Sequence, residues 1–387
     1  MQKTRKEPKT PLWKLNLIMM GALALCAALF ALLYTGGGVA VLGDTAASAT
    51  NLPGEDKALA TQTDLAPSPS VSPSPQAQVS TTGRLLPYLD ENGLWGYKNT
   101  LGQVAIKAVY TQAMEFEGKS AFAAQGGYFG LISRSGQWLA EPVWSSVLPF
   151  SEGKAAVESG DKWGYIDETG TLVIDYQFRE AGSFHCGRAM ARSGSEYGFI
   201  DVNGAVAVSQ KWSAVSDFGE DVAFARTSTG NSYIIDKVGE KIATLSARQY
   251  GAAFSESFAR IEEGAEVYFL NSKGQSAFKT RYQDALSFQN GYAAVKLEGK
   301  WGYINARGSL EISNQFADAA PFSGGYAAVK DAETGLWGYI SKAGTFVIDP
   351  QFDSAEPFDQ GYGLVSRNGE YSLVDKEGAL VYLYSQS

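Results

Sequence analysis

The chain has 387 residues, of which 45% are hydrophobic and 19% charged, and its formal net charge is −9. Five basic residues and one acidic residue within positions 1–43 leave a net charge of −13 on the remainder. An acidic body argues against nucleic acid as a partner, because phosphate binding needs a basic surface. The two cysteines, Cys26 and Cys186, cannot form a disulfide framework, since Cys26 lies within an apolar run.

The first predicted element is a membrane-spanning helix at residues 15–34. This uncharged stretch is close to the ~20 residues that cross a bilayer. The basic tail, residues 1–14, precedes it, so the positive-inside rule places the tail in the cytoplasm and the rest of the chain outside. We therefore expect a single-pass signal anchor in the cell membrane. Cleavage near Ala47-Ser48-Ala49 is the alternative, and Leu25 argues against lipidation of Cys26.

A linker is predicted at residues 44–83. It is rich in Ala, Ser, Thr and Pro, with alternating Pro and Ser between Ala66 and Pro75. Such a composition buries too little apolar surface to fold, and the prolines favour extended conformations. We expect a disordered tether between the anchor and the remaining chain.

Residues 85–387 contain about nine tandem repeats. The segment Lys162-Trp163-Gly164-Tyr165-Ile166-Asp167 returns in altered form at steps of 34 to 36 residues. Its first aromatic position, or the equivalent, falls at residues 95, 129, 163, 197, 232, 267, 301, 337 and 371. A second landmark keeps the same spacing, at Phe116, Phe150, Phe184, Phe218, Phe254, Phe288, Phe322 and Phe358.

The repeats predict an all-β fold of tandem three-stranded antiparallel units. Each has a glycine shortly after the Trp-Gly segment, and most have another after the Phe landmark, which leaves no room for the two helices of a TPR repeat. The strands expected in repeat order are WGYID, a stretch such as residues 171–174, and an Ala-Ala-Val stretch. Both a solenoid-like and a propeller-like array stay open. An open or irregular arrangement is favoured, because 34 residues is short for a four-stranded blade.

These motifs resemble those of the WG-repeat (KWG-repeat) family of bacterial proteins, over roughly residues 85–387. The resemblance rests on four intact Trp-Gly pairs and on the Gly-x-Ala-x-Val segments, and the repeats near residues 232 and 267 depart from it. It implies a β-rich repeat architecture that is often exported, without an established activity. We interpret the pairs as structural landmarks that join neighbouring repeats: Trp95-Gly96, Trp163-Gly164, Trp301-Gly302 and Trp337-Gly338. Glycine there would let a neighbouring backbone or ring approach closely.

Three tyrosines are the candidate ligand-binding residues. Lys119, Lys154 and Arg188 begin the Ala-Ala-Val strand in early repeats, and Tyr292, Tyr326 and Tyr362 do so in later ones. A column that accepts Lys and Arg is expected to be exposed, so these tyrosines could stack on a sugar or peptide. The alternative is an amphipathic strand with nothing bound.

No catalytic, metal or cofactor site is predicted. The one histidine, His185, excludes His-pair chemistry, and the Asp and Asn residues that precede each Gly suit turns better than calcium. We expect a non-catalytic binding or scaffold protein of the cell surface that recognises a protein or an envelope glycan. The alternatives are an envelope-glycan hydrolase with paired carboxylates, which composition alone does not exclude, and the ectodomain of a sensory complex.

Overall fold

The computed structural model describes residues 79–246 and 249–385, and those from Ser80 onward belong to one compact unit, Ser80–Ser387. These residues form β-strands and turns without a helix, so none of them provides a helix that could span a membrane. The predicted tail and span, and the linker up to residue 78, lie outside the described residues. The linker's last five residues, 79–83, are described and lead into the first strand.

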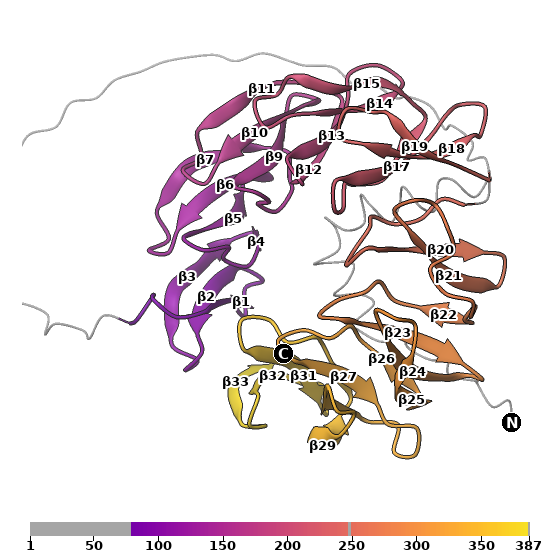
Figure 1. The fold of residues 1–387 in the computed structure, drawn as a ribbon. Helices are drawn as coiled ribbons and strands as arrows, with labels where there is room; N and C mark the ends of the chain where they lie inside the picture. Colours follow the sequence, from indigo (N-terminus) through magenta and orange to yellow (C-terminus); the bar gives the residue numbers. More distant parts are fainter. Residues whose placement is uncertain (1–78, 247–248, 386–387) are drawn as a thin grey trace, which may run out of the picture. The chain divides into compact units, whose positions relative to one another are not determined.

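Nine antiparallel sheets follow one another along the chain (Figure 1). We number them in chain order. Sheet 1 holds β1 (Leu85–Leu89), β2 (Trp95–Asn99) and β3 (Val104–Tyr110); sheet 2 holds β4 (Gln112–Ala113), β5 (Ser120–Gln125), β6 (Tyr128–Ser133) and β7 (Trp138–Trp144); sheet 3 holds β8 (Ser146–Val147), β9 (Lys154–Ser159), β10 (Lys162–Asp167) and β11 (Leu172–Phe178). Sheet 4 holds β12 (Glu180–His185), β13 (Arg188–Arg192), β14 (Tyr197–Ile200) and β15 (Val206–Trp212); sheet 5 holds β16 (Ala214–Val215), β17 (Val222–Arg226), β18 (Ser232–Asp236) and β19 (Lys241–Leu245); sheet 6 holds β20 (Phe258–Glu263) and β21 (Glu266–Asn271). Sheet 7 holds β22 (Asp284–Ala285), β23 (Tyr292–Leu297), β24 (Lys300–Asn305) and β25 (Leu310–Phe316); sheet 8 holds β26 (Asp318–Ala319), β27 (Tyr326–Lys330), β28 (Trp337–Ser341) and β29 (Phe346–Phe352); sheet 9 holds β30 (Ser354–Ala355), β31 (Tyr362–Arg367), β32 (Glu370–Asp375) and β33 (Leu380–Ser385).

The prediction of three strands per unit is wrong for most sheets, because seven of the nine have four. In six of these the added strand has two residues, such as Ser146–Val147, too short to leave a pattern in the sequence. The strands are also grouped differently from the predicted repeat. The Ala-Ala-Val strand pairs with the Trp-Gly strand that follows it, as Ala156 opposite Tyr165 shows.

The glycine after the aromatic residue allows the last strand of a sheet to bulge. Trp163 pairs with Phe178 and Tyr165 with Ile174, so the last strand has two extra residues there. A Cβ on Gly164 would lie 2.7 Å from the carbonyl oxygen of Ile174, closer than atoms can pack. Five further glycines face the last strand's backbone in the same way: Gly96, Gly130, Gly198, Gly302 and Gly338. In sheets 5 and 9, where Tyr233 and Ser372 replace this glycine, the pairing at this position is regular.

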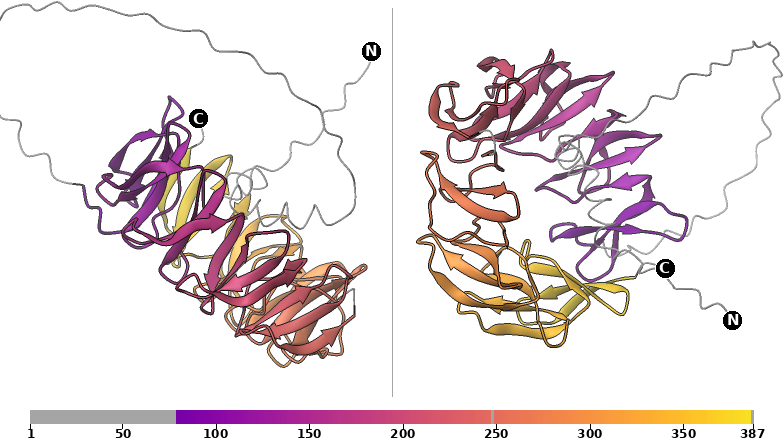
Figure 2. Two further views of the ribbon diagram at one scale, coloured as in Figure 1. Left: turned by 90° about the horizontal axis from the view of Figure 1, so that it is seen from above. Right: turned by 90° about the vertical axis from the view of Figure 1, so that its right-hand side faces the viewer.

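The described residues of this unit, 80–246 and 249–385, form a closed, propeller-like ring. Figures 1 and 2 show the sheets following one another round it, with sheet 9 beside sheet 1. The short first strands lie towards the centre and the last strands at the circumference, as β4 and β7 illustrate (Figure 1). The structure therefore corrects the expectation of an open or irregular array, since two-residue first strands and tight turns fit four strands into about 34 residues.

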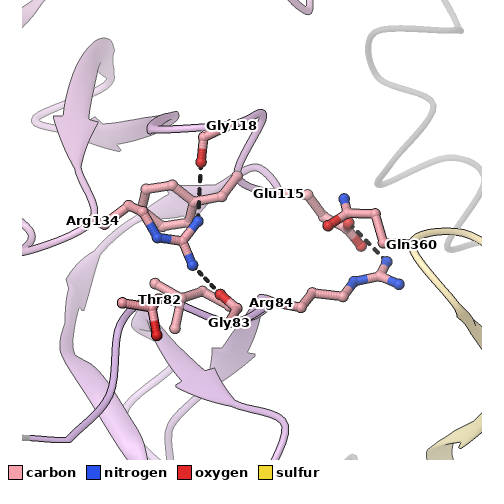
Figure 3. Close-up of a pocket in the computed structure, with 9 residues that line it drawn as sticks. Thr82, Gly83, Arg84, Glu115, Gly118, Arg134 and Gln360 are labelled. Atoms are coloured by element: carbon pink, nitrogen blue, oxygen red, sulfur yellow. Dashed lines mark hydrogen bonds and ion pairs between the residues drawn. The ribbon is translucent and has the colours of Figure 1, made fainter.

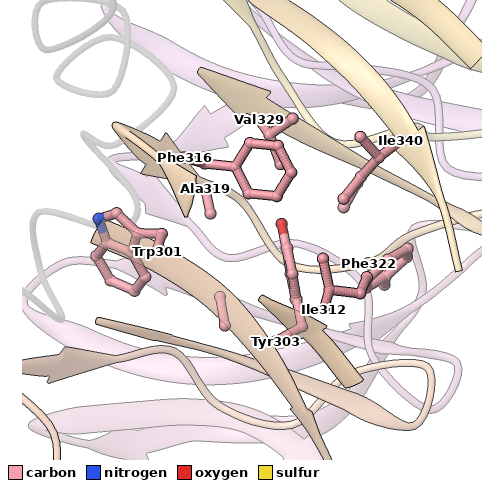
Figure 4. Packing of buried hydrophobic residues seen from close by; sticks show 10 residues of the cluster. Trp301, Tyr303, Ile312, Phe316, Ala319, Phe322, Val329 and Ile340 are labelled. Carbon is pink, nitrogen blue, oxygen red and sulfur yellow. The ribbon is translucent and has the colours of Figure 1, made fainter. Parts of the chain in front are cut away.

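The core is divided among the junctions between neighbouring sheets. Nine buried clusters occupy nine junctions, eight of them with seven to ten fully buried residues. Figure 4 shows the largest, in which Tyr303 and Ile312 of sheet 7 meet Phe322 and Val329 of sheet 8. The ninth cluster, centred on Leu86 and Leu373, joins sheet 9 to sheet 1 and closes the ring. A core divided in this way explains why each repeat carries large aromatics at fixed positions.

Candidate functional site

The same tight turn leads into β5, β9, β13, β17, β20, β23, β27 and β31, and we call these eight turns of sheets 2 to 9 the turn rim. They are residues 117–120, 151–154, 185–188, 219–222, 255–258, 289–292, 323–326 and 359–362, each closed by a bridge between its end residues. Six non-glycine residues adopt a left-handed backbone at equivalent positions: Glu152, Cys186, Glu220, Glu256, Asn290 and Gln360, with φ between 48° and 56°. The backbone is thus repeated around the rim while its side chains differ.

Several side chains of the turn rim hold the next turn. Ser151, Ser255 and Ser323 donate to the carbonyl oxygens of Phe184, Phe288 and Phe358, at 2.5–2.6 Å. The carboxylates of Glu152 and Glu256 each accept a backbone N–H of the next turn, at 2.8 Å. These hydrogen bonds give the Ser and Glu side chains a structural role that requires no ligand.

Each candidate tyrosine is the last residue of one turn of the turn rim. Tyr292, Tyr326 and Tyr362 are the first residues of β23, β27 and β31, and each is half-buried. The ring of Tyr292 lies 5.0 Å from that of Phe322, and the ring of Tyr326 lies 5.2 Å from that of Phe358. Tyr362 packs against the Leu86–Leu373 cluster. Their hydroxyls make no hydrogen bond to any other described residue.

The column that was expected to be exposed is therefore only partly exposed at these three tyrosines. Lys154 has the equivalent position in sheet 3, with its amine 5.7 Å from the centre of the Phe184 ring. A long basic side chain can cover a ring while its charge stays in water, so tolerance of Lys does not imply exposure. In sheet 2 the column residue is the buried Ser120, opposite Ser133, and Lys119 lies within the turn.

His185 replaces the turn-rim serine in sheet 4. Its Nε2 lies 3.8 Å from Oδ2 of Asp217, which belongs to the neighbouring sheet 5. Partial burial raises the pKa of Asp217, and the nearby His185 lowers it in part. Cys186 is a free thiol that packs beside Phe199 and Phe218. No three His, Cys, Asp or Glu residues of the described chain gather in a way that could hold a metal ion.

A polar pocket of about 260 Å³ lies where the ring closes. Arg84 reaches Glu115 of sheet 2, and Arg134 reaches the carbonyl oxygens of Gly83 and Gly118 (Figure 3). Gln360, from the turn rim of sheet 9, lines the other side. The repeat pattern singles out neither arginine, because no other repeat has an arginine at the equivalent position. Their one sequence signal is that Arg84 stands between the linker and the first strand.

A family model described as "WG containing repeat" matches residues 95–128, 129–163, 163–196, 269–301, 301–331 and 337–371. The chain belongs to the WG-repeat family. The unmatched interval between residues 196 and 269 contains sheet 5 and most of the two-stranded sheet 6. The departure expected near residues 232 and 267 thus falls where the WG pattern is interrupted.

The WG-repeat landmarks lie in the junctions between sheets. Trp301 is buried, and Trp95, Trp163 and Trp337 are partly buried against their clusters. The tyrosine that follows each Trp-Gly pair is buried. Its hydroxyl donates a hydrogen bond to a carbonyl oxygen that lies in the first strand of the next sheet or directly after it. The pairs are Tyr97 to Met114, Tyr165 to Gly182, Tyr303 to Ala320 and Tyr339 to Glu356, each at 2.8 Å. Burial raises the pKa of all four hydroxyls.

Several solved structures match this WG-repeat chain at low sequence identity. A crystal structure of a eukaryotic initiation factor has 12% identity and a TM-score of 0.54, covering 79% of this chain and 96% of that one. The computationally designed Ika8 protein has 13% identity and a TM-score of 0.42, covering 71% and 95% of the two chains. BamB from Moraxella catarrhalis has 11% identity and a TM-score of 0.36, covering 70% and 98%. No curated protein matches the sequence.

Proposed function

We propose that this WG-repeat protein is a non-catalytic binding or scaffold protein of a bacterial cell surface, whose turn rim recognises a protein or an envelope glycan. One observation carries the proposal: a turn of fixed backbone recurs in eight sheets while its residues vary. Ser-Glu, His-Cys, Gln-Asn and Asp-Gln all occupy equivalent positions in the turn rim. A rigid scaffold that presents variable turns is a common arrangement for recognition.

The proposed location rests on the N-terminal sequence. The basic tail and the apolar residues 15–34 have the pattern of a signal anchor, which would place the ring outside the cytoplasm. The Pro- and Ser-rich linker would then set the ring's reach from the membrane. A protein tethered in this way meets envelope glycans and exported proteins before any other partner.

Within the turn rim, the tyrosines of sheets 7 to 9 are the proposed ligand contacts. They are adjacent, partly exposed, and carry hydroxyls that are not engaged by the described residues. The amine of Lys342 lies 5.5 Å from the centre of the Tyr292 ring. Aromatic rings with free hydroxyls suit stacking and hydrogen bonding to a sugar or a peptide.

Binding of the full-length protein to purified envelope glycan, and separately to exported envelope proteins, tests the proposal. The test variant changes Tyr292, Tyr326 and Tyr362 to Leu, which keeps apolar packing against Phe322 and Phe358 but removes the stacking surface. We expect a loss of affinity of at least roughly tenfold, as aromatic anchors typically give. Tyr128→Leu is the matched control, because Tyr128 is exposed but lies outside the turn rim.

Three results would contradict this assignment. Unchanged affinity in the triple variant would remove the tyrosines as contacts. Failure of the wild-type protein to bind either preparation would argue against a recognition role. Cleavage of the glycan by the purified protein, lost on mutating one carboxylate, would establish the hydrolase instead.

A further inference from the structure

The junction between sheet 9 and sheet 1 differs from the other eight in how it is held. Neighbouring sheets elsewhere are joined by the chain itself, whereas sheets 1 and 9 meet at opposite ends of the described residues. No strand is exchanged between them, since sheet 1 consists of β1 to β3 and sheet 9 of β30 to β33. The junction, which we call the seam, therefore depends on side-chain contacts.

The apolar contact at the seam is small. Leu86 and Leu373 are its two fully buried residues, with Tyr362 and Leu364 partly buried beside them. The other junctions bury seven to ten residues each. Since hydrophobic stabilisation scales with buried apolar area, the seam has the weakest apolar contribution in the ring.

Arg84 adds ion pairs and a hydrogen bond to the small apolar contact at the seam. Its side chain is 10% exposed, and its Nη2 lies 3.0 Å from Oε2 of Glu115 and 2.9 Å from Oδ2 of Asp359. Nη1 also donates to the backbone oxygen of Asp359 at 2.6 Å. One guanidinium thus ties the start of sheet 1 to sheet 2 and to sheet 9. Without it, Glu115 and Glu356 would lie near each other with no compensating positive charge, and like charges repel.

Arg134 holds the segment that carries Arg84. Its Nε donates to the carbonyl oxygen of Thr81 at 2.5 Å, and its Nη2 donates to that of Gly83. Its guanidinium lies 5.1 Å from the centre of the Phe116 ring. Residues 80–84 are therefore fastened to sheet 2 by Arg134 and to sheet 9 by Arg84.

We infer that residues 80–84 form a strap that keeps the ring closed, and that displacing the strap opens the seam while the other junctions stay intact. Four of the five strap residues, 80–83, are the last residues of the predicted linker. Cleavage or a partner acting at the end of the linker would thus reach the seam before any other junction. The inference is independent of the ligand proposed for the turn rim.

Hydrogen exchange of the full-length protein, followed by mass spectrometry, tests the strap. In Arg84→Gln we expect amides of sheets 1 and 9 to exchange at least tenfold faster, with exchange in sheets 3 and 4 unchanged. Arg134→Gln keeps the guanidinium of Arg84 but frees the strap, so the same two sheets should respond to a smaller extent. If Arg84→Gln does not fold, the exchange rates of Arg134→Gln test the inference on their own.

Arg281→Gln is the matched control. Arg281 also contacts two carboxylates, Glu263 and Glu266, but it lies in the sheet 6 region away from the seam. It should leave exchange in sheets 1 and 9 unchanged. Unaltered exchange in sheet 9 of both strap variants would overturn the inference, and so would equal acceleration in all nine sheets.

Discussion

In six sheets the bulged backbone of the last strand crosses the second-to-last strand at the glycine that follows an aromatic residue. The aromatic residue and the glycine that follows it have different structural roles. The aromatic ring fills the junction between sheets, and the glycine leaves room for the neighbouring backbone. Where the glycine is absent, in sheets 5 and 9, the bulge at that position is absent as well.

Gly164→Ala tests this account of the pair. A Cβ there would meet backbone atoms of Ile174 and Tyr176 at 2.7 and 3.1 Å, so the last strand must shift. We expect a loss of roughly 1–3 kcal/mol in the free energy of unfolding, typical of overpacking, measured by urea denaturation. Gly194→Ala is the control, because a Cβ at that position would have no atom within 4 Å and its φ is not left-handed. Equal stability of the two variants would refute the account.

Glu356 gives the seam a defined pH dependence. Burial and the neighbouring Glu115 raise its pKa above the ordinary 4.5, and Arg84 lowers it in part. A carboxyl whose native pKa is raised contributes its full stability below its unfolded pKa, and this is lost as pH rises through the native pKa. Ionised Glu356 therefore destabilises the ring at neutral pH.

Glu356→Gln should accordingly raise the thermal unfolding midpoint at pH 7, by roughly 1–2 °C for a domain of this size. The gain should shrink as the pH falls and disappear below about 4.5, where the carboxyl is protonated in both states. Glu370→Gln, at an exposed glutamate of the same sheet, is the control. A gain that persisted at pH 4 would show that the charge is not its cause.

At the scale of the element, the sequence predicts the two long inner strands of each sheet well and the first strand poorly. The Trp-Gly and Ala-Ala-Val strands each carry a run of consecutive buried residues, three in β9 and three in β10, and they pair as antiparallel hairpins. First strands such as Ser146–Val147 leave no alternation to detect. Contacts with the preceding sheet position these first strands, and a local sequence pattern carries no information about those contacts.

Neighbouring elements are joined by the tyrosine that follows each Trp-Gly pair. Tyr303 is fully buried and donates to the carbonyl oxygen of Ala320 in the next sheet, at 2.8 Å. Tyr303→Phe would leave that oxygen without its donor, at a cost of about 1–2 kcal/mol in the free energy of unfolding. Tyr292→Phe is matched in chemistry but removes a hydroxyl without a partner among the described residues, so it should be close to neutral. Equal effects in urea denaturation would contradict the assigned role of the hydrogen bond.

At the scale of the whole ring, the repeat period predicts the number of units but not their closure. The nine Trp-equivalent positions correspond to nine sheets, because each period encodes one sheet and its contact with the next. The strap that we infer to keep the ring closed relies on Arg84, Arg134, Glu115 and Asp359, and none of these side chains recurs at the equivalent positions of the other repeats. The tyrosine column was found from the sequence, but its packing on Phe322 and Phe358 required the arrangement of neighbouring sheets.

Chemical cross-linking within one chain tests the closed ring most directly. Thr82 and Gln360 line one pocket at the seam, although 278 positions separate them in the sequence. With Cys26 and Cys186 changed to Ser, the pair Thr82→Cys and Gln360→Cys should be joined by a short bismaleimide within single chains. The pair Thr82→Cys and Asn290→Cys should not, because Asn290 has the same turn-rim position two sheets away. Equal reaction of both pairs, or linkage of the first pair only between chains, would contradict the closed ring.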